Sequence, residues 1–453
     1  MKNLSNTKIW NFDPMLQSEY FVLDQNIFTI DKTPEDVFFI ENIAEYNQMQ
    51  GLALSEEEVE YLEKLSKKAG RRLTDSEIFG FSQVNSEHCR HKIFNGKFII
   101  DEQEKEKSLF QLIKKTSQEN PNELVSAYKD NVSFNAGPEI EQFAPHSADK
   151  PDFFEIKKIN SVISLKAETH NFPTTVEPFN GAATGSGGEI RDRLAGGKAS
   201  LPLAGTAVYM TAYPSENVFE RQWLYQTPEQ ILIKASNGAS DFGNKFGQPL
   251  ICGSVLTFEH TENNKFYGYD KVIMLAGGVG FANAKDATKE EPQPQEKVVI
   301  LGGDNYRIGM GGGAVSSVET GNYADTIELN AVQRANPEMQ KRVANVIRSL
   351  AESDGNPIVS IHDHGAGGHL NCLSELVETT GGRFDLSEFP IGDPTLSARE
   401  IIGNESQERM GILLKSNDIE SVKRIAEREK APFYIVGETT DNKRLKFEFA
   451  IAK

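Results

Sequence analysis

Short apolar runs that end in glycine-rich segments recur from about residue 153 onward and limit the folds open to this chain. Lys297–Leu301 precedes one such segment and Pro357–Ile361 precedes another. A short apolar run stopped by glycine predicts a buried strand followed by a turn. Helical patterns alternate with these runs, so the sequence predicts a mixed α/β (α+β) fold.

The pattern divides the chain into three regions. Helices are expected from Ser55 and from Thr74, each with a glutamate three residues later as in a capping box, and the second is expected to run on into residues 85–92. A further helix begins at Asn336, where proline follows in the first helical position. The polar stretch Glu290–Glu296 marks a boundary. We expect a helical linker region and two α/β modules, at residues 1–150, 151–290 and 296–453.

The charge balance excludes some functions. The chain has 453 residues, with 48 lysines and arginines against 66 aspartates and glutamates, for a net charge of −18. A field of that sign repels a nucleic-acid backbone, but small phosphorylated ligands can still be bound by backbone N–H groups and a divalent metal. No apolar stretch approaches the ~20 residues of a membrane span. Three scattered cysteines argue against a disulfide framework or zinc cluster. We therefore expect a cytoplasmic protein.

One strand carries a cation, a carboxylate and an imidazole at two-residue spacing. Lys166, Glu168 and His170 would share one face of it, because side chains alternate along a strand. The cation could bind a phosphate, the carboxylate could bind a metal, and the imidazole could transfer a proton. The alternative is a strand whose outer face is merely polar. The opposite face, expected to point to a core, carries Ile163, Leu165 and Ala167.

A glycine-rich segment follows at Gly181–Asp192. We expect a loop there, because glycines let backbone N–H groups converge on an anion. Arg191 would grip a phosphate and Asp192 would suit Mg²⁺. The segment matches neither the phosphate loop ending in Gly-Lys-Ser/Thr nor the dinucleotide fingerprint. A flexible turn without a ligand is the alternative.

The residues alone do not decide the roles of three further features. Gly309–Gly313 is either a second ligand loop or a turn packed under a helix. Asp363 ends a buried strand, where it could bind metal or cap a helix. His88 and His91 lie three residues apart on the predicted helix, a spacing that gives little support for zinc.

Five segments together resemble the phosphoribosylformylglycinamidine synthase family, also called formylglycinamide ribonucleotide amidotransferase. The resemblance is closest to the large single-chain form and extends from about Ser55 to the end. It implies a fold like that of aminoimidazole ribonucleotide synthetase, with an N-terminal and a C-terminal module. The five segments are NSEHCRHK (85–92), KAETHNFP (166–173), GAATGSGGEIRD (181–192), IHDHGAGG (361–368) and NESQER (404–409).

The resemblance implies an activity in de novo purine biosynthesis. In that family, ATP phosphorylates the formamide oxygen of formylglycinamide ribonucleotide, and ammonia then displaces the phosphate to give the amidine. ATP and Mg²⁺ are the implied cofactors. The implied enzyme is an ATP-dependent C–N ligase that uses glutamine as its amide donor when intact.

Roles for individual residues follow from the same resemblance. His88 and His170 would be catalytic, with His170 as a proton acceptor, while His91 and Lys166 would contact ATP. Glu168, Asp192 and Asp363 would be the Mg²⁺ ligands, and Arg191 a substrate contact. The nucleotide-phosphate segment would comprise Gly181, Ala182, Ala183, Thr184, Gly185, Ser186, Gly187, Gly188, Glu189, Ile190, Arg191 and Asp192. Further substrate contacts would come from Thr169, Asn171, Phe172, Gln333, Glu405, Ser406 and Gln407.

Large family members carry a second synthetase half and a glutaminase domain with a Cys-His-Glu triad, and neither is visible here. We therefore interpret the chain as the linker plus the first synthetase half, with ammonia supplied from elsewhere. We expect a homodimer, aggregation or dependence on the missing half. One alternative is a nucleotide- and Mg²⁺-binding half-module that is inactive without its partner. Another is a related ATP-dependent enzyme such as a selenophosphate synthetase or a thiamine-phosphate kinase.

Overall fold

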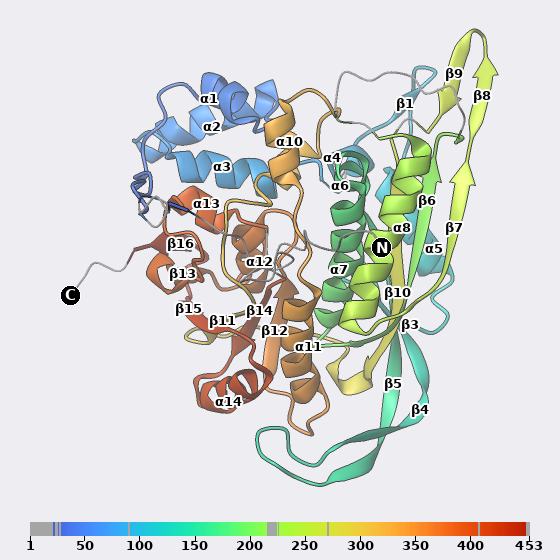
Figure 1. Cartoon of the computed structure of the whole chain (residues 1–453), viewed down its shortest axis with the longest axis vertical. Coiled ribbons are helices and arrows are strands. Elements are labelled where there is room, and N and C mark those ends of the chain that lie inside the picture. The colour runs from blue at the N-terminus through green and yellow to red at the C-terminus, as the bar shows by residue number, and fades with distance from the viewer. Residues whose placement is uncertain are drawn as a thin grey trace, which may run out of the picture.

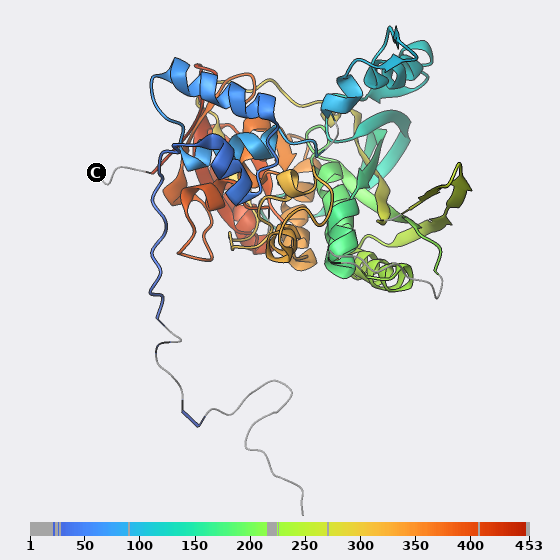
Figure 2. The same ribbon diagram turned by 90° about the horizontal axis from the view of Figure 1, so that it is seen from above.

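The computed structural model describes residues 21–22, 26, 29–88, 91–214, 224, 226–269, 271–405 and 408–449. Two six-stranded sheets lie side by side with helices between them and around them, and three N-terminal helices pack on the second sheet's module (Figure 1 and Figure 2). The mixed α/β fold with a helical linker region and two sheet modules is therefore confirmed. Within the described part of the chain, no helix is long and apolar enough to cross a bilayer.

The linker helices form where their capping signals predict them. Ser55 and Thr74 each complete a capping box, and Gly70 ends the first of these two helices with a left-handed φ of 66°. Together they enclose a small apolar core that includes Leu62 and Ile78. The helices of this region are α1 (Ile43–Gln50), α2 (Glu56–Ala69), α3 (Asp75–Val84), α4 (His91–Asn95) and α5 (Leu109–Glu119), with a short hairpin of β1 (Ile99–Ile100) and β2 (Gln103–Glu104).

The predicted continuation of the second helix into residues 85–92 is wrong. Helix α3 ends at Val84, and α4 begins only at His91, so His88 and His91 do not share one helix. The Asn85 side chain donates instead to Glu58 of α2, at 2.7 Å. Asparagine has low helix propensity and readily forms such alternative hydrogen bonds, which explains why the helix stops.

The first sheet has the strand order β3-β4-β5-β10-β6-β7 and is antiparallel except for the β6–β7 pair. Two of its strands precede residue 151, the expected start of the module. Gly137 and Pro138 interrupt the second of these with a register shift, which conceals the strand in the sequence. The strands are β3 (Leu124–Ser126), β4 (Ser133–Pro145), β5 (Phe154–Thr169), β6 (Leu201–Thr211), β7 (Leu250–Thr257) and β10 (Ile273–Asn283), and β8 (Glu259–Glu262) pairs with β9 (Lys265–Gly268) outside the sheet.

Within the described residues, the main helical cover of this sheet lies on one face (Figure 1). Helices α7 (Pro178–Leu194) and α8 (Pro228–Phe246) pack on it, and α6 (Asn171–Val176) precedes them. The prediction that Ile163, Leu165 and Ala167 point to a core is wrong, because they lie on the other face, where Leu165 is 42% exposed. The register continues this uncovered apolar face from Leu165 to Val279 of β10.

The second sheet has the order β12-β14-β11-β15-β13-β16 and carries helices on both faces. The strand predicted at Lys297–Leu301 is present over those residues, and Asn336 caps the predicted helix. The strands are β11 (Lys297–Leu301), β12 (Ile358–Asp363), β13 (Gly382–Asp385), β14 (Met410–Leu414), β15 (Phe433–Thr439) and β16 (Leu445–Glu448). The helices are α9 (Gly312–Val315), α10 (Asp325–Ala331), α11 (Pro337–Ala351), α12 (Gly368–Leu376), α13 (Ala398–Ile402) and α14 (Ile419–Glu429), with short 3₁₀ turns at Ala284–Asp286, Leu386–Glu388 and Ser416–Asp418.

One apolar core joins the two modules. Ile190 of α7 and Phe242 of α8 belong to the same buried cluster as Val343 of α11 and Ile361 of β12. The long hairpin of β4 and β5 also reaches the second module, where Arg424 forms an ion pair of 2.7 Å with Asp149. Strand β5 and helix α7 of the first module thereby face β12 and the glycine turns of the second.

Candidate functional site

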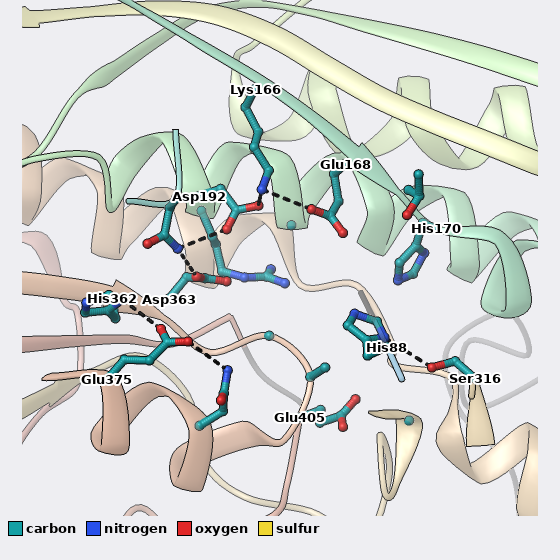
Figure 3. Close-up of a pocket in the computed structure, with 18 of the residues that line it drawn as sticks. His88, Lys166, Glu168, His170, Asp192, Ser316, His362, Asp363, Glu375 and Glu405 are labelled. Atoms are coloured by element: carbon teal, nitrogen blue, oxygen red, sulfur yellow. Dashed lines mark hydrogen bonds and ion pairs between the residues drawn. The ribbon is translucent and has the colours of Figure 1, made fainter. Parts of the chain in front are cut away.

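A cavity of about 1730 Å³ lies between the two modules. Strand β5 and helix α7 line one side, and β12, α9 and the turns after them line the other (Figure 3). The structure brings most of the predicted site residues into this one cavity. These are His88, His91, Lys166, Glu168, Thr169, His170, Asn171, Phe172, Thr184, Gly188, Arg191, Asp192, Gln333, Asp363 and Glu405. Ser406, Gln407 and Cys89 lie outside the described residues.

Lys166 and Glu168 reach the cavity from alternate positions of β5, as the strand pattern predicts. The Lys166 ammonium lies 3.2 Å from Glu168 Oε2 and 3.0 Å from Asp192 Oδ2 (Figure 3). Burial lowers the pKa of Lys166, but the charges of Asp192 and Glu168 outweigh it, so the net pKa is raised. Burial, followed by the Asp192 charge, raises the pKa of Glu168 to about 7. Two carboxylates thus share one ammonium, so full ionisation of both would leave an excess of negative charge.

Asn131 connects the carboxylate of Asp363 to that of Asp192. No feature of the sequence pointed to Asn131. Its Nδ2 donates to Asp363 Oδ1 at 2.8 Å and to Asp192 Oδ1 at 3.2 Å, so one amide bridges carboxylates from the two modules. Burial and the Asp192 charge raise the pKa of Asp363 well above its usual range. No local pattern marks Asn131, because its two carboxylate partners lie 61 and 232 residues away in the sequence. Across the described residues, no three His, Cys, Asp or Glu side chains are arranged closely enough to hold a metal ion by themselves.

The segment Gly181–Asp192 is not a loop. It lies within α7, and its cavity-lining residues Thr184, Gly188, Arg191 and Asp192 have the spacing of one helix face. Two glycines of the segment permit close packing. A Cβ on Gly181 would lie 2.3 Å from the Pro173 carbonyl carbon, and one on Gly187 would lie 2.6 Å from the Phe242 ring. Tertiary packing thus outweighs the helix-breaking tendency of glycine.

The guanidinium of Arg191 is already partly engaged. Its Nη1 donates to Gln340 Oε1 at 2.9 Å and lies 3.8 Å from Glu408 Oε1. Gln340 in turn donates to the carbonyl of Gly187 at 3.0 Å, so α11 fixes the arginine on α7. Arg191 Nε is buried without a hydrogen-bond partner among the described residues. The side chain is therefore held in place at the cavity wall, with its buried Nε–H without a partner among the described residues.

Two imidazoles face each other across the cavity (Figure 3). His170 Nδ1 lies 2.6 Å from the carbonyl oxygen of Gly181 and must donate to it, which leaves Nε2 as an acceptor. Burial lowers the pKa of His170 to about 4, so its ring is neutral near pH 7. His88 Nδ1 lies 3.1 Å from Ser316 Oγ, and burial also lowers the pKa of His88. His91 lies further out, with its ring against Phe110 at 5.3 Å.

Glu405 connects two glycine-rich segments through hydrogen bonds to their backbone. Its Oε1 accepts from the backbone N–H of Gly367 at 2.9 Å and of Gly313 at 3.4 Å. Burial raises the pKa of Glu405 to about 7, although these N–H groups and the Gln333 side chain act in the opposite direction. The carboxylate is therefore committed chiefly to shaping the cavity wall.

The Glu405→Gln variant is expected to gain stability relative to the parent protein as pH rises. A carboxyl with a raised folded-state pKa favours folding at low pH, and this contribution is lost between its ordinary pKa of 4.5 and about 7. The gain should be on the order of 3 kcal/mol between pH 4.5 and 8, measured by urea unfolding. Glu77→Gln is the control of opposite sign, because Arg71 lowers the pKa of Glu77. A pH-independent difference for Glu405→Gln would contradict the assignment.

A second charged group at the far end of the cavity also escaped the sequence analysis. Lys289 Nζ lies 2.6 Å from Asp130 Oδ1 and 3.1 Å from His362 Nε2, and His362 Nδ1 lies 2.9 Å from Glu375 Oε2. These residues come from separate segments, so no local pattern connects them. Their charges are largely satisfied by one another.

Two parts of the sequence match known domain families. Residues 293–450 match the C-terminal domain of AIR synthase related proteins, and residues 43–92 match the formylglycinamide ribonucleotide amidotransferase linker domain. Residues 43–92 of the chain are thus similar to the linker domain of formylglycinamide ribonucleotide amidotransferase. The resemblance drawn from the five segments is thereby confirmed. The linker-domain match spans α1 to α3 and extends past His88 to the start of α4.

Solved structures share the fold. Thermotoga maritima PurL complexed with FGAR has 23% sequence identity and a TM-score of 0.62, and the match covers 86% of this chain and 54% of that one. The same protein complexed with ATP has 22% identity and a TM-score of 0.60, with coverage of 87% and 53%. PurLQS from Thermotoga maritima has 22% identity and a TM-score of 0.56, with coverage of 86% and 52%. The chain therefore spans about half the length of the proteins that it resembles.

Proposed function

We propose that this chain contributes the ATP-dependent step that converts formylglycinamide ribonucleotide to formylglycinamidine ribonucleotide in de novo purine biosynthesis. The carrying observation is that Lys166, Asp192, Asp363 and two histidines meet in one cavity between the modules. The linker-domain match favours this reaction over a selenophosphate synthetase or a thiamine-phosphate kinase. The related Thermotoga maritima PurL has been solved in complexes with FGAR and with ATP.

The reaction transfers the γ-phosphoryl group of ATP to the formamide oxygen and releases ADP. Ammonia then forms the new C–N bond as phosphate leaves with the former formamide oxygen. Lys166 and Arg191 would neutralise charge that develops on phosphoryl oxygens, which is the main way proteins accelerate such transfers. His170, with its proton on Nδ1, would present Nε2 as the acceptor for a proton lost by ammonia. His88 would act from the opposite wall, and a glutaminase domain or subunit would supply the ammonia.

Mg²⁺ belongs to the same proposal. Glu168, Asp192 and Asp363 offer hard carboxylate oxygens, and Lys166 is the ammonium that partly offsets their charge. Burial, followed by the Asp192 charge, raises the pKa of Glu168, and a cation at the cluster would offset both effects. When bound, the ion would neutralise phosphate charge. Asn131 and Lys166 would keep the carboxylates close together in its absence.

An ammonia-dependent ADP-release assay with formylglycinamide ribonucleotide tests the proposed reaction. Turnover that requires the nucleotide substrate, ATP and ammonia together is the expected result. Tight binding of ATP and substrate without ADP release would favour the alternative of a binding half-module that is inactive alone. The length of the relatives gives that alternative its support, because the chain spans only about half of them.

Pairing through the first sheet is a further expectation of the proposal. Its uncovered face is apolar, with Leu165 42% and Leu256 46% exposed, and a second copy or a missing synthetase half would cover it. Light scattering is expected to show a homodimer, and Leu165→Asp should shift it toward monomer. Ile233→Asp, at an exposed position of α8, is the control that should leave the mass unchanged. A well-behaved monomer of the unmodified chain would contradict the pairing.

A further inference from the structure

Ser316 links the predicted catalytic His88 to a backbone carbonyl of the second module. Its Oγ lies 3.1 Å from His88 Nδ1 and 3.2 Å from the carbonyl oxygen of Gly313. A carbonyl oxygen can only accept, so Ser316 makes both hydrogen bonds at once only if its single hydroxyl proton is donated to Gly313. In that arrangement the hydroxyl oxygen accepts from His88, which places the imidazole proton on Nδ1.

The short helix that carries Ser316 is fixed from two sides. Glu405 accepts from the backbone N–H of Gly313, and Gln83 of the linker helix α3 accepts from that of Ala314, at 3.3 Å. The Ser316 backbone N–H bonds back to Gly312 at 3.0 Å. The hydroxyl therefore has a defined position relative to His88, although 228 residues separate the two in sequence.

The tautomer of His88 determines what its other ring nitrogen can do. A neutral imidazole with its proton on Nδ1 has a lone pair on Nε2, which can then accept a hydrogen bond or a proton. Free histidine in water favours the opposite tautomer, with the proton on Nε2, so a specific partner is needed to reverse the preference. Ser316 is such a partner, and His88 lies in the same cavity as His170.

We propose that Ser316 is a positioning residue that holds His88 in the tautomer protonated on Nδ1, so that Nε2 serves as an acceptor for a reacting group. The tautomer follows from the hydrogen bonds alone. The benefit to catalysis rests on the proposed function, because it requires His88 to act on the substrate. Two separate measurements distinguish these parts.

Nitrogen-15 NMR of histidine-labelled protein reads the tautomer without any turnover. The unmodified chain should show His88 protonated on Nδ1 at a pH where the ring is neutral. Ser316→Ala should raise the population protonated on Nε2, and Ser316→Thr should restore the original state because it keeps the hydroxyl. Ser317→Ala is the matched control, since Ser317 also donates to Gly313, at 2.8 Å, but within the described part of the chain it forms no hydrogen bond with His88. An unchanged His88 tautomer in Ser316→Ala would overturn the proposal.

The second measurement is ammonia-dependent ADP release by the same variants. Loss of one hydrogen bond that orients the ring should lower kcat roughly tenfold in Ser316→Ala and leave the KM for ATP unchanged, with recovery in Ser316→Thr. A tautomer change without a rate change would uphold the positioning of His88 and refute its catalytic role. Thermal unfolding of each variant, matched to the unmodified chain, separates both results from a loss of folding.

Discussion

Asp192→Asn and Asp363→Asn are each expected to weaken the binding of Mg²⁺–ATP by at least tenfold and up to about a hundredfold. Each substitution removes one of three carboxylates that surround Lys166 and Asn131 at the cavity wall. With a carboxylate gone, the cluster has less negative charge to attract the divalent cation, and one hard oxygen ligand becomes a neutral amide. Isothermal titration calorimetry with Mg²⁺–ATP measures the change, and a titration with ATP in EDTA isolates the metal-dependent part.

Glu375→Gln is the control for this pair of variants. Its carboxylate lines the same cavity and pairs with His362 at 2.9 Å, but it has no predicted role toward the metal. The affinity of the Glu375→Gln variant for Mg²⁺–ATP should change by less than about threefold. Unchanged affinity in both aspartate variants would refute the proposed metal site.

Glu189→Ala is expected to lower the free energy of unfolding by about 3–5 kcal/mol, the largest stability effect we anticipate. Glu189 Oε2 lies 2.8 Å from Arg193 Nε and 2.7 Å from its Nη2, and both side chains are at most 1% exposed. Gln248 completes the group by donating to Glu189 Oε1 at 2.6 Å. Removing the carboxylate leaves the Arg193 charge buried without its counter-ion. Urea unfolding monitored by circular dichroism measures the loss.

A surface pair provides the comparison for this variant. Glu60 and Lys64 of α2 form an ion pair of 3.1 Å one helical turn apart, but their side chains are 68% and 74% exposed. Glu60→Ala should cost no more than about 0.5 kcal/mol. If Glu189→Ala cost as little as Glu60→Ala, the buried pair would not be stabilising α7.

The elements that could be predicted are those whose ends the local sequence defines. The caps at Ser55, Thr74 and Asn336 place the starts of three helices correctly, and the apolar run Lys297–Leu301 is a buried strand. Helix α7 was misread as a loop because four glycines in eight residues look flexible. Its stability depends on close contacts with distant segments such as Phe242, which no local pattern reveals.

In the candidate site, too, the residues set by local sequence could be predicted, and those set by distant contacts could not. The alternation of Lys166 and Glu168 along β5 was predicted from strand geometry and is present. Asn131 and Ser316 were missed because their partners lie 232 and 228 residues away in the sequence. The expectation for Leu165 failed for a different reason. Strand alternation separates two faces but does not show which one the helices cover.

The apolar cluster shared by α7, α8, α11 and β12 has a mechanical consequence. Because the two modules share one apolar core, a hinge motion that separated them would expose those side chains to water. Ligands are therefore expected to enter the cavity without a large separation of the two modules. A crosslink between the modules should accordingly leave ligand entry unimpeded.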